Sequence, residues 1–143
     1  MGYAMERMAD AATLARTLAV DLSAAAGATV GVRLTRPAEH RDERLGEPAG
    51  TLVDALPVDC DDYGPPNPSH LAAGGEVVAE TLVSQALMSN CPVTGQPDYA
   101  SLAVSYRGPR IDPAGLLRYV VSFRRHSGFH EACVERIFVD LMR

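Results

Sequence analysis

A proline-rich run near the middle of the chain places the strongest constraint on its fold. Three prolines fall within nine residues, in the run Asp61-Asp62-Tyr63-Gly64-Pro65-Pro66-Asn67-Pro68-Ser69. Proline fixes φ and has no N–H to donate, so this run can form neither a regular helix nor a central strand. The sequence therefore predicts two halves, residues 1–60 and 76–143, joined by a linker at residues 61–75.

The first half shows a helical pattern followed by two extended patterns. Three leucines spaced by four residues predict an amphipathic helix over residues 10–26, and Gly27 stands where that helix would end. Residues 29–35 alternate between apolar and polar side chains, as a half-buried strand does. Residues 51–60 are also extended and apolar-rich, and Pro57 favours an edge or a bulge there. The predicted order is helix, strand, strand.

The second half predicts two strands followed by two helices. Residues 76–88 fit either a helix or a long strand, and their β-branched start favours a strand. Residues 101–107 alternate cleanly and are expected to pair with it across the intervening loop. Asp112-Pro113 is a typical helix start, and this helix should run to about His126. After Ser127-Gly128, a second helix is predicted from about residue 129 to residue 141.

Composition excludes several classes of function. The 143-residue chain has a formal net charge of −5, which provides no positive surface for a nucleic-acid backbone. Its three cysteines contain no C-x-x-C pair, which argues against a disulfide framework and for a reduced, cytoplasmic protein. The first ten residues do not resemble a signal peptide, and no apolar run approaches the ~20 residues of a membrane span. We therefore expect no direct nucleic-acid or membrane partner.

The loop that joins the two strands of the second half carries the candidate chemistry. It contains Cys91 and, seven residues later, Asp98, and the two prolines between them stiffen the turn. A thiol can act as a covalent nucleophile and a carboxyl group as a proton donor. The alternatives are a cysteine packed as a small hydrophobic residue and an aspartate that only serves the turn.

Three runs in the second half together resemble the 7-cyano-7-deazaguanine reductase family. They are residues 89–98 (SNCPVTGQPD), residues 106–112 (YRGPRID), and residues 117–124 (LRYVVSFR) with 129–138 (FHEACVERIF). The resemblance is to the two-module form and implies an α+β tunnelling fold, in which helices pack on one face of an antiparallel sheet. It implies that residues 1–60 are the tail of a first module and residues 76–143 the start of a second, so that the fold is incomplete at both ends.

The resemblance also implies a reaction. Members of the family use NADPH to reduce the nitrile of 7-cyano-7-deazaguanine to an aminomethyl group, in the biosynthesis of the tRNA nucleoside queuosine. By position, Cys91 would attack the nitrile carbon to give a thioimide, Asp98 would protonate the nitrogen, and His130 would line the pocket near that nitrogen. The residues that it assigns to substrate binding are Ser89, Asn90 and Glu131. The family's NADPH-contacting motif does not occur in this sequence, so no residue is assigned to the cofactor, and no metal is expected.

Several alternatives remain open at this point. Glu131 could simply complement a helix start, and His130 could be a packed histidine. Cys133 lies one helical turn from His130, but a zinc site needs more ligands than the spacing supplies. Met88 and Tyr99 depart from the lysine and tryptophan typical of the family.

The alternative function is a catalytically incomplete module that binds a deazapurine or pterin and assembles with another subunit. Because the implied fold lacks strands at both ends, an exposed sheet edge also predicts a homo-oligomer, such as a homodimer.

Overall fold

The computed structural model describes residues 3–40 and 46–143, which belong to two compact units divided between residues 45 and 46. Residues 46–60 thus fold with the second half of the chain. Across the described ranges, no helix is both long enough and apolar enough to cross a membrane. Each unit is described by itself.

The first unit is built around the predicted helix. α1 spans Ala11–Ala26, the Asp10 side chain accepts a hydrogen bond from the main-chain N–H of Thr13, and Gly27 ends the helix with a left-handed φ of 64°. The prediction of this helix is confirmed. Two short 3₁₀ turns, η1 (Tyr3–Met5) and η2 (Pro37–His40), complete the described elements. The prediction of a strand at residues 29–35 is wrong, because this segment is irregular and pairs with no strand among the residues that the structure describes.

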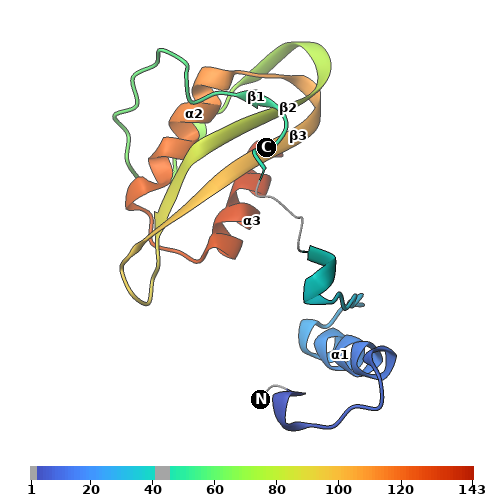
Figure 1. The fold of residues 1–143 in the computed structure, drawn as a ribbon. Coiled ribbons are helices and arrows are strands. Elements are labelled where there is room, and N and C mark those ends of the chain that lie inside the picture. Colours follow the sequence, from blue (N-terminus) through green and yellow to red (C-terminus); the bar gives the residue numbers. More distant parts are fainter. Residues whose placement is uncertain (1–2, 41–45) are drawn as a thin grey trace. The chain divides into compact units, whose positions relative to one another are not determined.

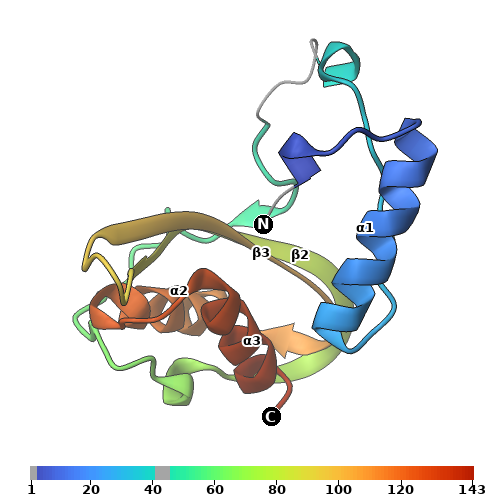
Figure 2. The ribbon, with the colours of Figure 1, turned by 90° about the horizontal axis from the view of Figure 1, so that it is seen from below.

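The second unit is a three-stranded sheet with helices on one face. Its elements are β1 (Thr51–Leu52), η3 (Pro68–His70), β2 (Ala73–Asn90), β3 (Pro97–Ile111), α2 (Pro113–Val121), η4 (Ser122–Arg125) and α3 (His130–Leu141). β2 and β3 form a long antiparallel hairpin, and α2 and α3 lie along one face of it (Figures 1 and 2). The two strands and the last helix predicted for residues 76–143 are thereby confirmed. The first predicted helix begins as expected, but α2 ends at Val121 and the 3₁₀ turn η4 follows it to Arg125, where the prediction had one helix to about His126.

The sheet is mixed, which corrects the predicted antiparallel sheet. The strand order is β1-β2-β3, and β1 runs parallel to β2 through Thr51 opposite Leu82 and Leu52 opposite Val83. Only two residues of the extended segment predicted over residues 51–60 pair as a strand. The architecture is α+β, as predicted; its assignment to the tunnelling fold remains a prediction.

The proline-rich segment is packed against the helices. The Arg125 N–H donates to the Tyr63 carbonyl oxygen at 2.8 Å, and the Asn67 N–H donates to the Ser122 hydroxyl oxygen at 3.0 Å. The segment contains a cis peptide bond before Pro65. Residues 61–72 therefore pack alongside α2 and η4 as a strap, and these contacts hold the strap in the second unit.

A buried polar cluster ties α2 to α3. Tyr119 and Asp140 are both buried, and the Tyr119 hydroxyl donates to Asp140 Oδ2 at 2.8 Å, as does Arg136 Nε at 2.6 Å. Burial alone would raise the pKa of Asp140, but these two donors hold it below its ordinary value. Burial and the neighbouring Asp140 raise the pKa of Tyr119, so its hydroxyl stays a donor.

A bulge in β2 sets the orientation of the strand's last residues. Between Ser84 and Leu87, β2 has one more residue than β3, so the two strands change register there. The Asp54 carboxylate fixes the bulge, because it accepts from the Ser84 hydroxyl at 2.6 Å and from the Gln85 N–H at 2.7 Å. Beyond the bulge, Leu87 and Ser89 are buried on the helix-covered face.

Candidate functional site

The end of the β2–β3 hairpin brings predicted site residues together. Ser89 and Asp98 are cross-strand partners, so their side chains share one face of the sheet. Ser89 is buried and Asp98 half-buried, which places this face toward the helices. Cys91 follows two residues after Ser89, where β2 ends and the turn begins. A hydroxyl, a thiol and a carboxyl group therefore gather at the hairpin tip.

The turn favours the thiolate form of Cys91. Its main-chain N–H and carbonyl groups bond to Gln96 and Gly95, each at 2.8 Å, which fixes the turn. The Thr94 hydroxyl and the main-chain N–H groups of Thr94 and Val93 hold the pKa of Cys91 below its ordinary value, although burial and the charge of Asp98 oppose this. The position of Thr94, three residues after a cysteine in a turn, is the sequence signal that could have revealed its role.

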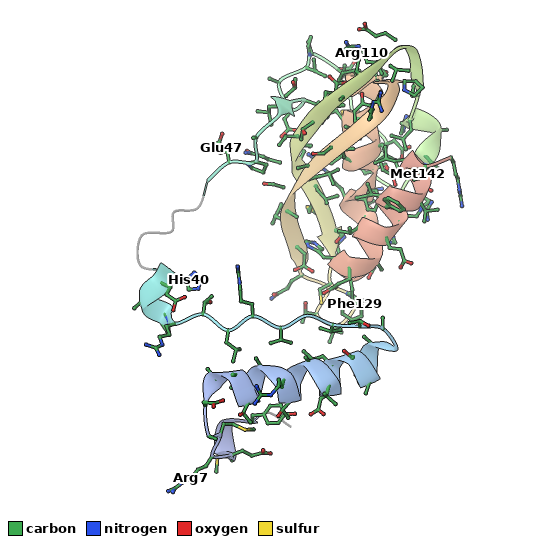
Figure 3. All side chains as sticks on the ribbon, turned by 90° about the vertical axis from the view of Figure 1, so that its right-hand side faces the viewer. Arg7, His40, Glu47, Arg110, Phe129 and Met142 are labelled. Atoms are coloured by element: carbon green, nitrogen blue, oxygen red, sulfur yellow. The ribbon has the colours of Figure 1, made fainter. Side chains whose placement is uncertain are left out.

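A second set of contacts brings the start of α3 to this hairpin end. The Gly128 N–H donates to the Asn90 carbonyl oxygen at 3.1 Å, and Asn90 forms a parallel bridge with Ser127. α3 then begins at His130. Figure 3 shows Phe129, just before α3, near the hairpin tip, while Arg110 lies at the opposite end of the sheet. His130 is thus placed at the same end of the unit as Cys91.

Two buried polar atoms at this end have no hydrogen-bond partner within the described parts of the chain. They are Ser89 Oγ and His130 Nε2. A buried polar atom without a partner is unfavourable by about 1–3 kcal/mol, so native proteins rarely retain one without a reason. A hydroxyl and an imidazole nitrogen without partners, at the same end of the unit as a thiol, are suited to bind polar atoms of a ligand.

Other predicted residues have more ordinary surroundings. Glu131 is exposed in the first turn of α3, where the helix dipole favours a carboxylate. Met88 and Tyr99 are cross-strand partners on the sheet face opposite Ser89, and Tyr99 is 72% exposed. The substitutions at these two positions therefore lie on the other side of the sheet from the gathered site side chains. A substrate contact for Glu131 stays a prediction.

One apolar hollow of this unit lies between β3 and α3, away from Cys91. A groove between β3 and the second half of α3 has a volume of about 320 Å³ and is lined in part by Val104, Tyr106, Phe138 and Leu141. It does not include Ser89, Cys91 or His130. The hairpin-tip residues therefore lie outside this groove, with Ser89 buried and Cys91 and Asp98 half-buried.

Arginines that could serve a cofactor phosphate are largely engaged within the chain. Arg110 pairs with Glu76 and Glu80, and Arg118 donates to the Asp59 carbonyl oxygen. Arg124 and Arg125 both lie over the Tyr63 ring. Across residues 3–40 and 46–143, no three His, Cys, Asp or Glu side chains cluster in a way that could hold a metal ion.

Known proteins share both the motifs and nearly the whole length of the chain. Residues 97–143 match the family model of the QueF-like proteins. The chain is 52% identical over 139 residues to an NADPH-dependent 7-cyano-7-deazaguanine reductase of Azoarcus sp. (strain BH72), an alignment that covers 97% of this chain and 49% of the relative.

A reductase of the same name from Chromobacterium violaceum is 50% identical over 141 residues, covering 99% of this chain and 50% of the relative. A third, from Burkholderia ambifaria (strain MC40-6), is 54% identical over 128 residues, which cover 88% of this chain and 46% of the relative. The resemblance predicted from the motifs is confirmed, and the chain spans about half the length of the curated relatives it matches.

Proposed function

From the QueF-like domain at residues 97–143, we propose that this chain carries the covalent half of 7-cyano-7-deazaguanine reduction in queuosine biosynthesis. The observation that supports it is the hairpin tip, where an activated thiol, a carboxyl group and two unpartnered polar atoms lie at one end of the sheet. The names of the relatives state both the substrate and the dependence on NADPH.

The proposed step adds Cys91 to the nitrile. The sulfur forms a bond to the nitrile carbon, one carbon–nitrogen π bond opens, and the nitrogen gains a proton, which gives a thioimide. Asp98 delivers that proton, and the thiol is its source overall, so the step is neither an oxidation nor a reduction. Ser89 and His130 direct their free polar atoms at the substrate, and Glu131 binds the edge of its ring.

NADPH would supply the hydrides that reduce the thioimide to the aminomethyl product. No residue of this chain is assigned to it, because the family's cofactor motif does not occur in the sequence. Arg110, Arg118 and Arg124 also have partners within the chain. The residues described here support binding, covalent capture and proton delivery. The tunnelling fold, with residues 1–60 and 76–143 as parts of two modules, is proposed on the same grounds.

The test is incubation with 7-cyano-7-deazaguanine alone. We expect a new thioimide absorbance and a mass increase equal to one substrate molecule, both lost in Cys91→Ala. Cys60→Ala is the matched control, because Cys60 is also a free, half-buried cysteine, and it should retain the adduct. Equal behaviour of Cys91→Ala and the parent chain would remove Cys91 as the nucleophile.

The second candidate is an incomplete deazapurine- or pterin-binding module that assembles with another subunit. The partners of Arg110 and Arg124 within the chain favour it, since these two side chains are less available to bind a cofactor phosphate. Adding NADPH to the preformed adduct separates the two, because release of the amine by this chain alone would exclude the incomplete module. Metal analysis would address the zinc alternative, which requires bound metal in the active protein.

A further inference from the structure

We infer that Asn90 is the positioning residue that holds Cys91 and His130 in a fixed relation, and that the N–H groups of its side chain serve this contact and not the substrate. The inference rests on the proposed function, because it assigns Asn90 a part in that reaction. It replaces the substrate-binding role predicted for this asparagine.

Asn90 joins β2 to the connection between η4 and α3 through both its main chain and its side chain. Its N–H donates to the His126 carbonyl oxygen at 2.9 Å, and its carbonyl accepts from the Gly128 N–H at 3.1 Å. Its side-chain Nδ2 donates to the Arg124 and His126 carbonyl oxygens at 3.0 and 3.3 Å. Four hydrogen bonds therefore converge on this one residue.

The side-chain chemistry at this position is specific to an amide. The last carbonyl groups of a helical segment have no partner within the helix, and Arg124 lies in the last turn of η4. The two N–H bonds of Nδ2 fill this need, so neither remains for a ligand. An aspartate has the same shape but would bring a carboxylate against two carbonyl oxygens, and a leucine would leave both carbonyls without this donor.

The two groups that Asn90 connects are the proposed reacting residues. Cys91 is the next residue along the chain, and His130 is two residues beyond Gly128, at the start of α3. Loss of the side-chain contacts would allow the 124–128 connection to shift along β2 and carry His130 with it. A misplacement of ~1 Å at a catalytic group lowers a rate by about 100-fold.

The experiment compares Asn90→Leu, Asn90→Gln and the control Gln85→Leu, which makes the same amide-to-leucine change at an exposed site on β2. Three measurements are made on each folded variant: the rate of thioimide formation with 7-cyano-7-deazaguanine, the rate of Cys91 alkylation by iodoacetamide, and the NMR signals of the His130 ring.

In Asn90→Leu we expect thioimide formation to slow by about 10- to 100-fold. Alkylation should stay within about twofold, because the Thr94 contacts that favour the thiolate remain. The His130 ring signals should shift. Asn90→Gln, which keeps the amide, should recover part of the rate, and Gln85→Leu should match the parent.

Unchanged thioimide formation and unchanged His130 signals in Asn90→Leu would overturn the inference. An equal loss of alkylation and thioimide formation would also overturn it, because that pattern indicates general damage to the turn. Should Asn90→Leu not fold, Asn90→Ser replaces it, and Asn90→Gln must then exceed Asn90→Ser in rate. If the parent forms no adduct, the proposed function fails, while the His130 signals still decide the role of Asn90.

Discussion

At the scale of single residues, the reactivity of Cys91 depends on two neighbours with opposite effects. The Thr94 hydroxyl lowers the pKa of the thiol, and the Asp98 charge raises it. Thr94→Val should therefore move the pH profile of iodoacetamide alkylation to higher pH, while Asp98→Asn should move it to lower pH. Mass spectrometry of Cys91 over a pH series measures both shifts. Profiles that move in the same direction in both variants would contradict this account of the turn.

The hydroxyl of Tyr119 provides the most direct test of the buried polar cluster between α2 and α3. Tyr119→Phe removes the hydroxyl that donates to buried Asp140 and should lower the free energy of unfolding by about 1–2 kcal/mol. Tyr99→Phe is the control, because the Tyr99 side chain is 72% exposed and its loss of a hydroxyl should have little effect. Urea denaturation measures both changes. A Tyr119→Phe variant as stable as Tyr99→Phe would show that the cluster adds no net stability.

At the scale of elements, α2 contains a glycine that its packing requires. A Cβ at Gly115 would lie 2.2 Å from the carbonyl oxygen of His70, which belongs to the strap packed alongside the helix. Helix propensity alone predicts that Gly115→Ala stabilises by about 1 kcal/mol, but overpacking against main chain costs about 1–3 kcal/mol. We expect a lower melting temperature for Gly115→Ala and little change for Gly74→Ala, where a Cβ meets nothing within 4 Å. A higher melting temperature for Gly115→Ala would mean that the main chain at His70 can move away from the added methyl group at little cost in free energy.

The sequence predicts an element well where its ends depend on residues close by in the chain. The ends of α1 and α2 follow from capping residues such as Asp10, Gly27 and Asp112, whose effect extends only a few positions. A strand forms only where another strand pairs with it. The alternating pattern at residues 29–35 therefore gave a wrong prediction, and nothing in the sequence indicated the parallel pairing of β1 with β2. The same limit applies to the site.

The motif indicates Cys91 and Asp98 because they lie in one loop. Asn90, by contrast, bonds to carbonyl groups at Arg124 and His126, and nothing near it in the sequence predicts those contacts. The buried Nε2 of His130 is equally invisible before the fold is known. The residue types and the resemblance of the motifs thus indicated reactive groups, while the contacts that position them required the tertiary structure.

At the scale of the whole molecule, the predicted oligomer is still to be tested. Within the described residues, β3 pairs on one side with β2 and has no strand on its other side. Val134 and Phe138, 59% and 64% exposed, line a second hollow, between β3 and α3. Edge strands of this kind readily pair with another chain, so we expect light scattering during size-exclusion chromatography to give the mass of a dimer or larger. A monodisperse monomer across a range of concentrations would contradict this prediction.

Because of the bulge in β2, the orientation of side chains at the hairpin tip depends on the number of residues in the strand, which a substitution does not change. Side chains alternate along a strand, so one extra residue between Ser84 and Leu87 exchanges the two faces for every position that follows. Asp54, on a separate segment, holds that extra residue in place. Removing a single residue there would reverse the parity of the strand and direct the Ser89 hydroxyl away from the helices. In such a variant every residue of the site would be present in the sequence, yet the site would not be assembled.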